Sequence, residues 1–94
     1  MVDPELDELR REFLAEAAEK VREIETAVES ASMERVTYLA HQLKGSGGSY
    51  GFKRISSVAA DLEKTAERTG DDAQLREFTA SLRAEIEDRA RELA

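Results

Sequence analysis

The chain has 94 residues, of which 40% are hydrophobic and 37% are charged, and its formal net charge at pH 7 is −7. This length suits one core, and the balance of apolar and charged residues is typical of a folded, helix-rich chain. We therefore expect residues 1–94 to form a single domain. Nucleic acid and anionic membrane surfaces favour clustered Lys and Arg, so the negative charge argues against both and favours a protein partner.

The sequence contains no cysteine, which excludes a disulfide framework and a thiolate metal site or nucleophile. No apolar run approaches the roughly 20 residues that a membrane span needs. The first five residues also lack the basic start and apolar stretch of a signal peptide. These observations predict a cytoplasmic protein that does not cross a membrane.

Two amphipathic helices are expected in the first half of the chain. Asp3 and Pro4 are typical of an N-cap followed by the first helical turn, and the first helix should extend to about Glu29. Its apolar stripe comprises Leu6, Leu9, Phe13, Ala17, Val21, Ile24 and Val28. A polar break follows, in which Ser32 is the expected cap of a second helix. The inward seam of this helix comprises Met33, Val36, Ala40, Leu43, Gly47 and Tyr50.

Two further helices follow after Gly51, which can supply the positive-φ turn that ends the second helix. The third helix should stop at Gly70, and Asp71 should cap the fourth. Their apolar residues are Phe52, Ile55, Val58, Ala59, Leu62 and Ala66, then Leu75, Phe78, Leu82, Ile86 and Leu93. Short connections force neighbouring helices to run in opposite directions, so the sequence predicts an all-α, antiparallel up-down-up-down four-helix bundle. A long coiled coil is disfavoured because the breaks come too often.

The second helix carries the only histidine, His41. At 100° per residue, His41 lies about 140° from the centre of the inward seam, so it should face solvent. Lys44, Gly45 and Gly48 share its face, whereas Gly47 falls on the seam, where a small residue allows close packing. Glycines inside a helix cost about 1 kcal/mol each relative to alanine. Lys44 places a cation beside the imidazole, and the glycines have no side chain that would block approach. This face would therefore allow another protein to reach the ring.

Imidazole is a good nucleophile near neutral pH when its other nitrogen donates a hydrogen bond. Glu63, on the flank of the third apolar stripe, is the candidate acceptor for that bond. The competing interpretation is an ordinary surface acid, or a salt bridge from Glu63 to Lys64 or Arg54.

A docking surface around the histidine is also expected. Tyr38, three residues before His41, together with Gly48, Leu9 and Phe13, is the candidate set. Isolated exposed apolar residues are common, and that is the alternative interpretation.

The sequence His-Gln-Leu-Lys-Gly-Ser at positions 41–46 resembles the signature of the histidine phosphotransfer (HPt) family. Gly51 lies ten positions after the histidine, and Glu63 twenty-two positions after it, as in that family's pattern. Phe-Leu-Ala-Glu at positions 13–16 is similar to the family's opening. The resemblance therefore extends over nearly the whole chain, although the fourth helix matches only in pattern.

The resemblance implies a relay in which a receiver-domain phospho-aspartate or a histidine kinase phosphorylates the exposed histidine, which passes the group to a receiver aspartate. By position, His41 would be the phosphoacceptor and Lys44 the positive charge beside the phosphoryl group. Gly45 would leave room for the approaching partner protein, and Glu63 would orient the imidazole. Such a carrier has no catalytic cycle of its own and is not an enzyme. It needs no cofactor or metal, because the Mg²⁺ belongs to the receiver domain, and we expect a monomer.

Glutamate at position 63 is also similar to the phosphoacceptor domain of chemotaxis-type histidine kinases. Many of those carry a second histidine three residues earlier, where this chain has Ala60, so a free-standing phosphotransfer protein or an excised domain fits equally well. A non-catalytic helical adaptor or dimerisation module, which keeps the fold without using the histidine, is the alternative function.

Overall fold

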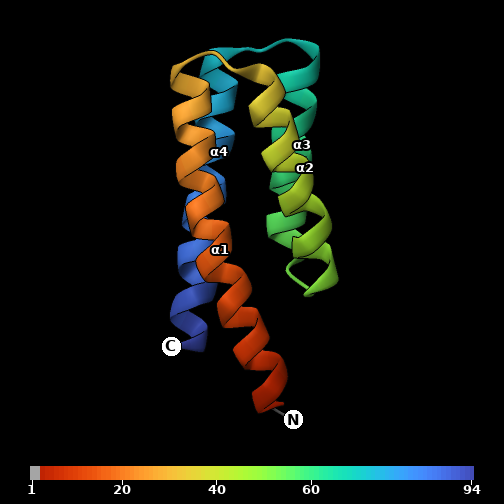
Figure 1. Cartoon of the computed structure of the whole chain (residues 1–94), viewed down its shortest axis with the longest axis vertical. Helices are drawn as coiled ribbons and strands as arrows, with labels where there is room; N and C mark the ends of the chain where they lie inside the picture. Colours follow the sequence, from red (N-terminus) through yellow and green to blue (C-terminus); the bar gives the residue numbers. More distant parts are fainter. Residues whose placement is uncertain (1–2) are drawn as a thin grey trace.

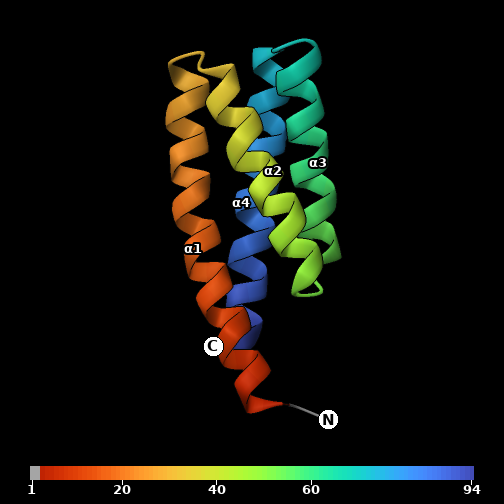
Figure 2. The same ribbon diagram turned by 45° about the vertical axis from the view of Figure 1, so that its right-hand side comes forward.

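The computed structural model describes residues 3–94, which form four helices joined by three short loops and include no strand. The helices are α1 (Pro4–Glu29), α2 (Met33–Ser49), α3 (Lys53–Arg68) and α4 (Asp72–Leu93). Successive helices run in opposite directions along a body of 43 × 18 × 16 Å (Figures 1 and 2). The prediction of an all-α, antiparallel four-helix bundle is confirmed.

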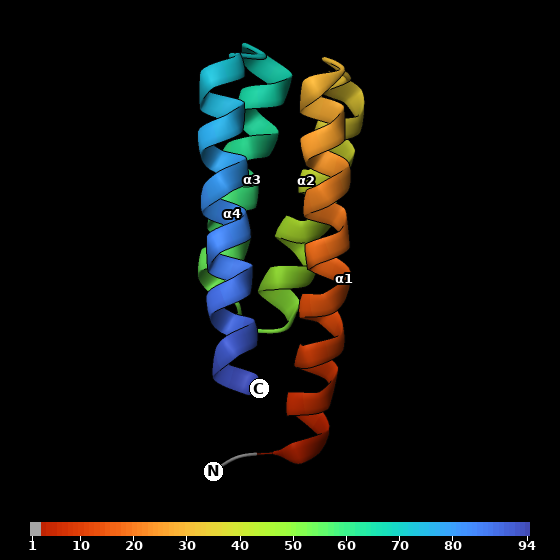
Figure 3. The ribbon, with the colours of Figure 1, turned by 90° about the vertical axis from the view of Figure 1, so that its left-hand side faces the viewer.

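The four helices occupy the corners of a square, so that each packs against two neighbours. α1 lies beside α2 and α4, and α3 lies beside α2 and α4. In Figure 3, α1 and α4 lie in front, and α2 and α3 lie behind them. Within residues 3–94, no helix combines the length and apolar character that a membrane span requires.

The apolar stripes meet in one core to which every helix contributes. The fully buried side chains include Ile24 of α1, Leu43 of α2, Ile55 and Leu62 of α3, and Leu82 of α4. Close packing of such side chains is the main source of stability in a bundle of this size.

The inward face of α2 is wider than the sequence predicts. Leu39, which the predicted seam omits, is only 2% exposed, whereas Met33 and Tyr50 are partly buried. The reason is that α2 packs against both α1 and α3 and therefore buries a broader arc than a single stripe.

Two of the three predicted helix caps are present. The carboxylates of Asp3 and Asp71 accept backbone N–H bonds at the starts of α1 and α4, the latter from Gln74 at 3.0 Å. Ser32 stands at the start of α2, but its side chain makes no capping bond. Its Oγ lies 2.9 Å from Oγ of Ser30 instead, so the capping role predicted for Ser32 is wrong.

All three loops contain one residue in the left-handed region. Gly51 has φ +83°, as predicted, and Gly70 has φ +62°. The first loop places Ala31 in this region, with φ +54°, although alanine carries a Cβ. There the backbone N–H of Ser32 donates to the carbonyl of Ala27 at 2.8 Å, which closes the end of α1.

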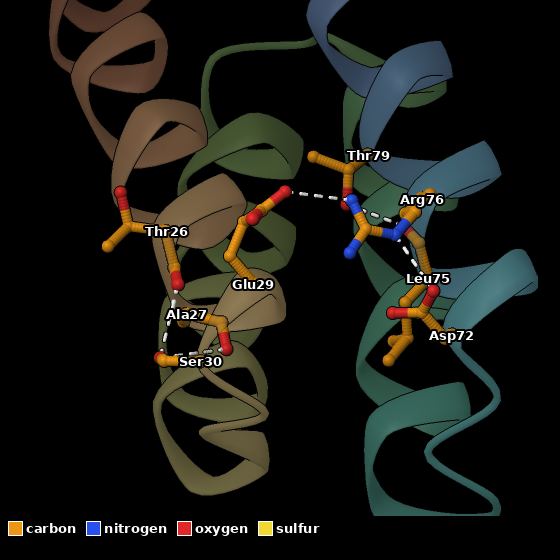
Figure 4. Close-up of polar contacts among 8 residues, drawn as sticks. All are labelled: Thr26, Ala27, Glu29, Ser30, Asp72, Leu75, Arg76 and Thr79. Atoms are coloured by element: carbon orange, nitrogen blue, oxygen red, sulfur yellow. Dashed lines mark hydrogen bonds and ion pairs between the residues drawn. The ribbon is translucent and has the colours of Figure 1, made fainter.

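An exposed ion-pair cluster joins α1 to α4 near the first and third loops. The Arg76 guanidinium donates to Asp72 at 2.8 Å and to Glu29 across the helix pair at 3.0 Å (Figure 4). Thr79, one turn further along α4, donates to the carbonyl of Leu75 at 2.6 Å. Solvent screening keeps the contribution of such exposed pairs small, so the core dominates the pairing of these helices.

Candidate functional site

The imidazole of His41 lies on the outward face of α2 and its side chain is 65% exposed. The exposure follows from helical phase, because Ala40 and Leu43, its neighbours on the inward side, are fully buried. Nδ1 of His41 is 2.8 Å from Oε2 of Glu63, which projects from α3. The candidate contact between the histidine and the glutamate is therefore made.

Glu63 binds two groups of α2 at once, and its side chain is only 12% exposed. While Oε2 contacts His41, Oε1 lies 2.8 Å from Nζ of Lys44. The hydrogen bond from Lys44 is the largest cause of a lowered pKa for Glu63, and the bond to His41 lowers the pKa further, whereas burial opposes both. Neither Lys64 nor Arg54 forms an ion pair with Glu63, so the competing salt bridges are absent from residues 3–94.

The charge of Glu63 decides the tautomer of the histidine. Because the lowered pKa keeps the carboxylate ionised at neutral pH, its oxygens can only accept, and Nδ1 of His41 must be the donor. In the neutral imidazole this leaves the lone pair on Nε2, the outer nitrogen. A nucleophilic nitrogen is thus presented at an exposed surface.

The three glycines of α2 have different surroundings. A Cβ added to Gly45 would meet nothing within 4 Å, so this position is open space beside the imidazole. At Gly48 it would lie 3.6 Å from Oγ of Ser56, an ordinary contact. At Gly47 it would lie 3.1 Å from Cγ2 of Ile55 and 3.3 Å from the backbone N of Ser56. Gly47 therefore allows the close approach of α2 and α3, as its place on the seam predicts.

Ser56 is a contact that the sequence analysis missed. Its hydroxyl donates to the backbone carbonyl of Lys44 at 2.7 Å and so ties α3 to α2 close to the site. Sequence periodicity marks Ser56 only as a polar residue on the flank of a stripe. Its partner becomes apparent only when the register of α3 against Gly47 is known.

One residue of the predicted docking surface, Phe13, is buried. Tyr38 and Gly48 are exposed as expected, Tyr38 at 57%. Phe13 is only 6% exposed, because its ring stacks against Tyr50 and Phe52 with centroid distances of 5.1 and 5.7 Å. Phe13 therefore belongs to the core, where it packs under the loop between α2 and α3.

Leu9 is exposed at 46% but lies far along the bundle from Tyr38. At about 1.5 Å per residue, Leu9 is roughly 30 Å from the end of α1, and Tyr38 is roughly 8 Å from the adjoining start of α2. The two helices run antiparallel from one loop, which separates these side chains by about 20 Å along the axis. By the same reckoning Gly48 lies roughly 22 Å from the start of α2, between the levels of Tyr38 and Leu9. Burial therefore removes only Phe13 from the predicted set, and a docking surface that uses the exposed residues stays a prediction.

Across residues 3–94, no three His, Cys, Asp or Glu side chains form a group that could hold a metal ion. The site at His41 consists of an imidazole bound by one carboxylate, with a lysine ammonium bound to the same carboxylate. The structure thus presents one nucleophilic nitrogen at the surface of an antiparallel four-helix bundle, where a reactant can approach it from solvent.

A family model described as Hpt domain matches residues 8–92. No curated protein and no solved structure matches the chain. The chain belongs to the Hpt domain family, and its role is histidine phosphotransfer in a phosphorelay. Hpt domains are phosphoryl-carrier modules that interact with the receiver domains and kinases of two-component systems.

Proposed function

We propose that Nε2 of His41 accepts a phosphoryl group from a receiver-domain phospho-aspartate or a kinase domain and passes it to a receiver aspartate. The observation that carries this proposal is the 2.8 Å contact between Nδ1 of His41 and Glu63, which leaves the lone pair on the outward nitrogen. The match of residues 8–92 to the Hpt domain model supports it independently.

Transfer from a receiver phospho-aspartate conserves atoms and charge without a further co-reactant. The Nε2 lone pair forms a bond to phosphorus while the bond from phosphorus to the aspartyl oxygen breaks, and its electron pair leaves with the carboxylate. The proton on Nδ1 stays in place, so the phosphorylated ring is a cation that faces the Glu63 carboxylate. Transfer to a receiver aspartate is the reverse of this step.

Lys44 and Gly45 prepare the surface for the arriving group. The Lys44 ammonium is already part of the cluster at 2.8 Å from Glu63 and can donate to phosphoryl oxygens on the same face. The open space at Gly45 leaves room for the partner. The receiver supplies the Mg²⁺ and the acceptor aspartate, and this chain supplies neither a cofactor nor a catalytic cycle. A monomeric state and a cytoplasmic location stay predictions.

Incubation with phosphorylated receiver domains from the source organism tests the proposal. Wild-type protein should acquire an acid-labile, base-stable label, and His41→Gln should acquire none. The chain contains one histidine, so no second imidazole can take the label. Circular dichroism checks that the variant folds. Equal labelling of His41→Gln would remove the proposal, and unchanged signalling in cells with His41→Ala would point to a non-catalytic adaptor.

A further inference from the structure

A shallow depression adjoins His41 on the side toward the start of α2. Its apolar lining comes from Met33, Tyr38 and Ala66, and two glutamates, Glu34 and Glu67, line it as well. α2 supplies Met33, Glu34 and Tyr38, whereas α3 supplies Ala66 and Glu67. The depression is thus formed by the same two helices that hold His41 and Glu63, but none of its apolar or acidic residues named here takes part in the transfer step.

The charges on the two sides of His41 are opposite. Glu34 and Glu67 are exposed, and within residues 3–94 neither makes an ion pair. On the other side, toward the end of α2, Lys44 is followed by the open backbone of Gly45. A phosphoryl dianion is repelled by the acidic side and attracted by the lysine side.

Tyr38 gives the depression an exposed aromatic surface. Its hydroxyl accepts a hydrogen bond from Nε2 of Gln42 at 2.9 Å, while its side chain stays 57% exposed. A lysine or arginine from a partner can lay its aliphatic stem against such a ring and extend its charge to nearby carboxylates. The combination of an aromatic ring with Glu34 and Glu67 therefore fits a cationic side chain better than a purely apolar one.

We propose that this depression orients the receiver domain by binding a lysine or arginine on its docking surface between Glu34, Glu67 and the ring of Tyr38. The phospho-aspartate then approaches His41 from the side of Lys44 and Gly45. This inference rests on the proposed function, because it concerns the partner of the same transfer. It assigns the acidic residues beside the site to partner selection and leaves the chemistry to His41, Lys44 and Glu63.

A charge-reversal experiment with a matched control tests the orientation. The probe is the phosphorylated receiver domain that labels wild-type protein fastest in the experiment above. In Glu34→Lys/Glu67→Lys, transfer should slow by about tenfold at low salt, with a weaker slope against salt concentration. Glu77→Lys/Glu87→Lys makes the same change in net charge on α4, which lies in front in Figure 3, and should stay within about twofold of wild type. Phosphoramidate, a small phosphoryl donor, should label all three proteins at similar rates.

Equal transfer rates for the two double variants would overturn the inference, even if His41 carries the label in every protein. Failure of both the receivers and phosphoramidate to label wild-type His41 would instead remove the proposed function. Where the lysine variant does not fold or does not react with phosphoramidate, Glu34→Gln/Glu67→Gln decides the question with Glu77→Gln/Glu87→Gln as its control. A slower transfer in the first pair than in the second supports the inference, and equal rates reject it.

Discussion

The imidazole of His41 and the carboxylate of Glu63 are 22 residues apart in the sequence and meet at 2.8 Å across the α2–α3 interface. Glu63 also holds Lys44 at 2.8 Å, so one carboxylate orients the nucleophile and positions the nearby cation. Because the acceptor lies on the neighbouring helix α3, it binds the ring at Nδ1 and leaves Nε2 uncovered. The site therefore combines exposure with a defined tautomer.

Without the Glu63 carboxylate, His41 should no longer be held in one tautomer. In Glu63→Ala, Nδ1 of His41 loses its partner, both neutral tautomers become populated, and labelling by phosphoramidate should slow by about tenfold, or roughly 1.4 kcal/mol in the barrier. Imidazole ¹⁵N chemical shifts measure the tautomer directly. Glu67→Ala, one turn further along α3, is the control and should keep the proton on Nδ1. An unchanged tautomer in Glu63→Ala would contradict the assigned role.

Lys44 should control the ionisation of Glu63. Because its hydrogen bond is the largest cause of the lowered pKa, Lys44→Met should move the pKa of Glu63 back toward its ordinary value of 4.5. The ¹³C shift of the Glu63 carboxyl, followed through an acid titration, measures this change. Lys44→Arg keeps a cation at the position and should retain a lowered pKa. A Glu63 titration that Lys44→Met leaves unaltered would show that another group holds the charge.

The lowered pKa of Glu63 also predicts how stability depends on pH. A carboxyl whose folded-state pKa lies below its unfolded value of 4.5 stabilises the fold above that pH, and the contribution is lost as the pH falls through the folded-state pKa. The difference in unfolding free energy between wild type and Glu63→Gln should therefore favour wild type at neutral pH and shrink in acid. Urea unfolding at several pH values measures it. In a Lys44→Met background most of this pH dependence should disappear, and its persistence there would argue against the pairing.

The helices were predictable because local chemistry marks their ends and a regular period marks their inner faces. Asp3, Gly51 and Gly70 act where the sequence places them, as a cap and two turn residues. Ser32 does not cap α2, because its hydroxyl makes a hydrogen bond with the hydroxyl of Ser30 in the loop. Leu39 was missed because a single stripe underestimates the arc that a helix buries between two neighbours.

Within the site, the exposure of His41 was predictable from phase alone, but its contacts were not. Whether Glu63 reaches the ring depends on the separation and register of α2 and α3, which Gly47 and Ser56 help to set. Phe13 is a different case. Its place on the apolar stripe of the first helix already indicates burial, and this argues against a docking role. Only the structure shows that the Phe13 ring stacks on Tyr50 and Phe52.

Ala31 is a site where a small change should stabilise the protein. Its φ of +54° costs a residue with a Cβ about 1 kcal/mol, and glycine avoids this cost. Ala31→Gly should therefore raise the unfolding free energy by up to about 0.5 kcal/mol after the extra freedom of the unfolded chain is included. The same substitution at the exposed helical Ala15 should lower it by about 1 kcal/mol. Thermal unfolding distinguishes the two, and destabilisation by Ala31→Gly would contradict the strained turn.

Gly45 and Gly47 should respond in opposite ways to the same substitution. Alanine at Gly45 enters open space inside a helix, so Gly45→Ala should stabilise the fold by about 0.5–1 kcal/mol. Alanine at Gly47 would meet Ile55 at 3.1 Å, so Gly47→Ala should destabilise the fold by about 1–3 kcal/mol. Urea unfolding measures both effects.

The rate of phosphotransfer should fall in Gly45→Ala although the stability of the fold rises. The added methyl group lies on the face of His41, where the partner must approach, so Gly45→Ala should slow transfer from a phosphorylated receiver although the protein is more stable. Phosphoramidate is small enough to avoid the methyl group, and its labelling rate should change little. Receiver transfer at the wild-type rate in Gly45→Ala would show that this glycine does not provide the clearance. A slower transfer combined with higher stability would show that the glycine at position 45 serves access to the histidine at the expense of helix stability.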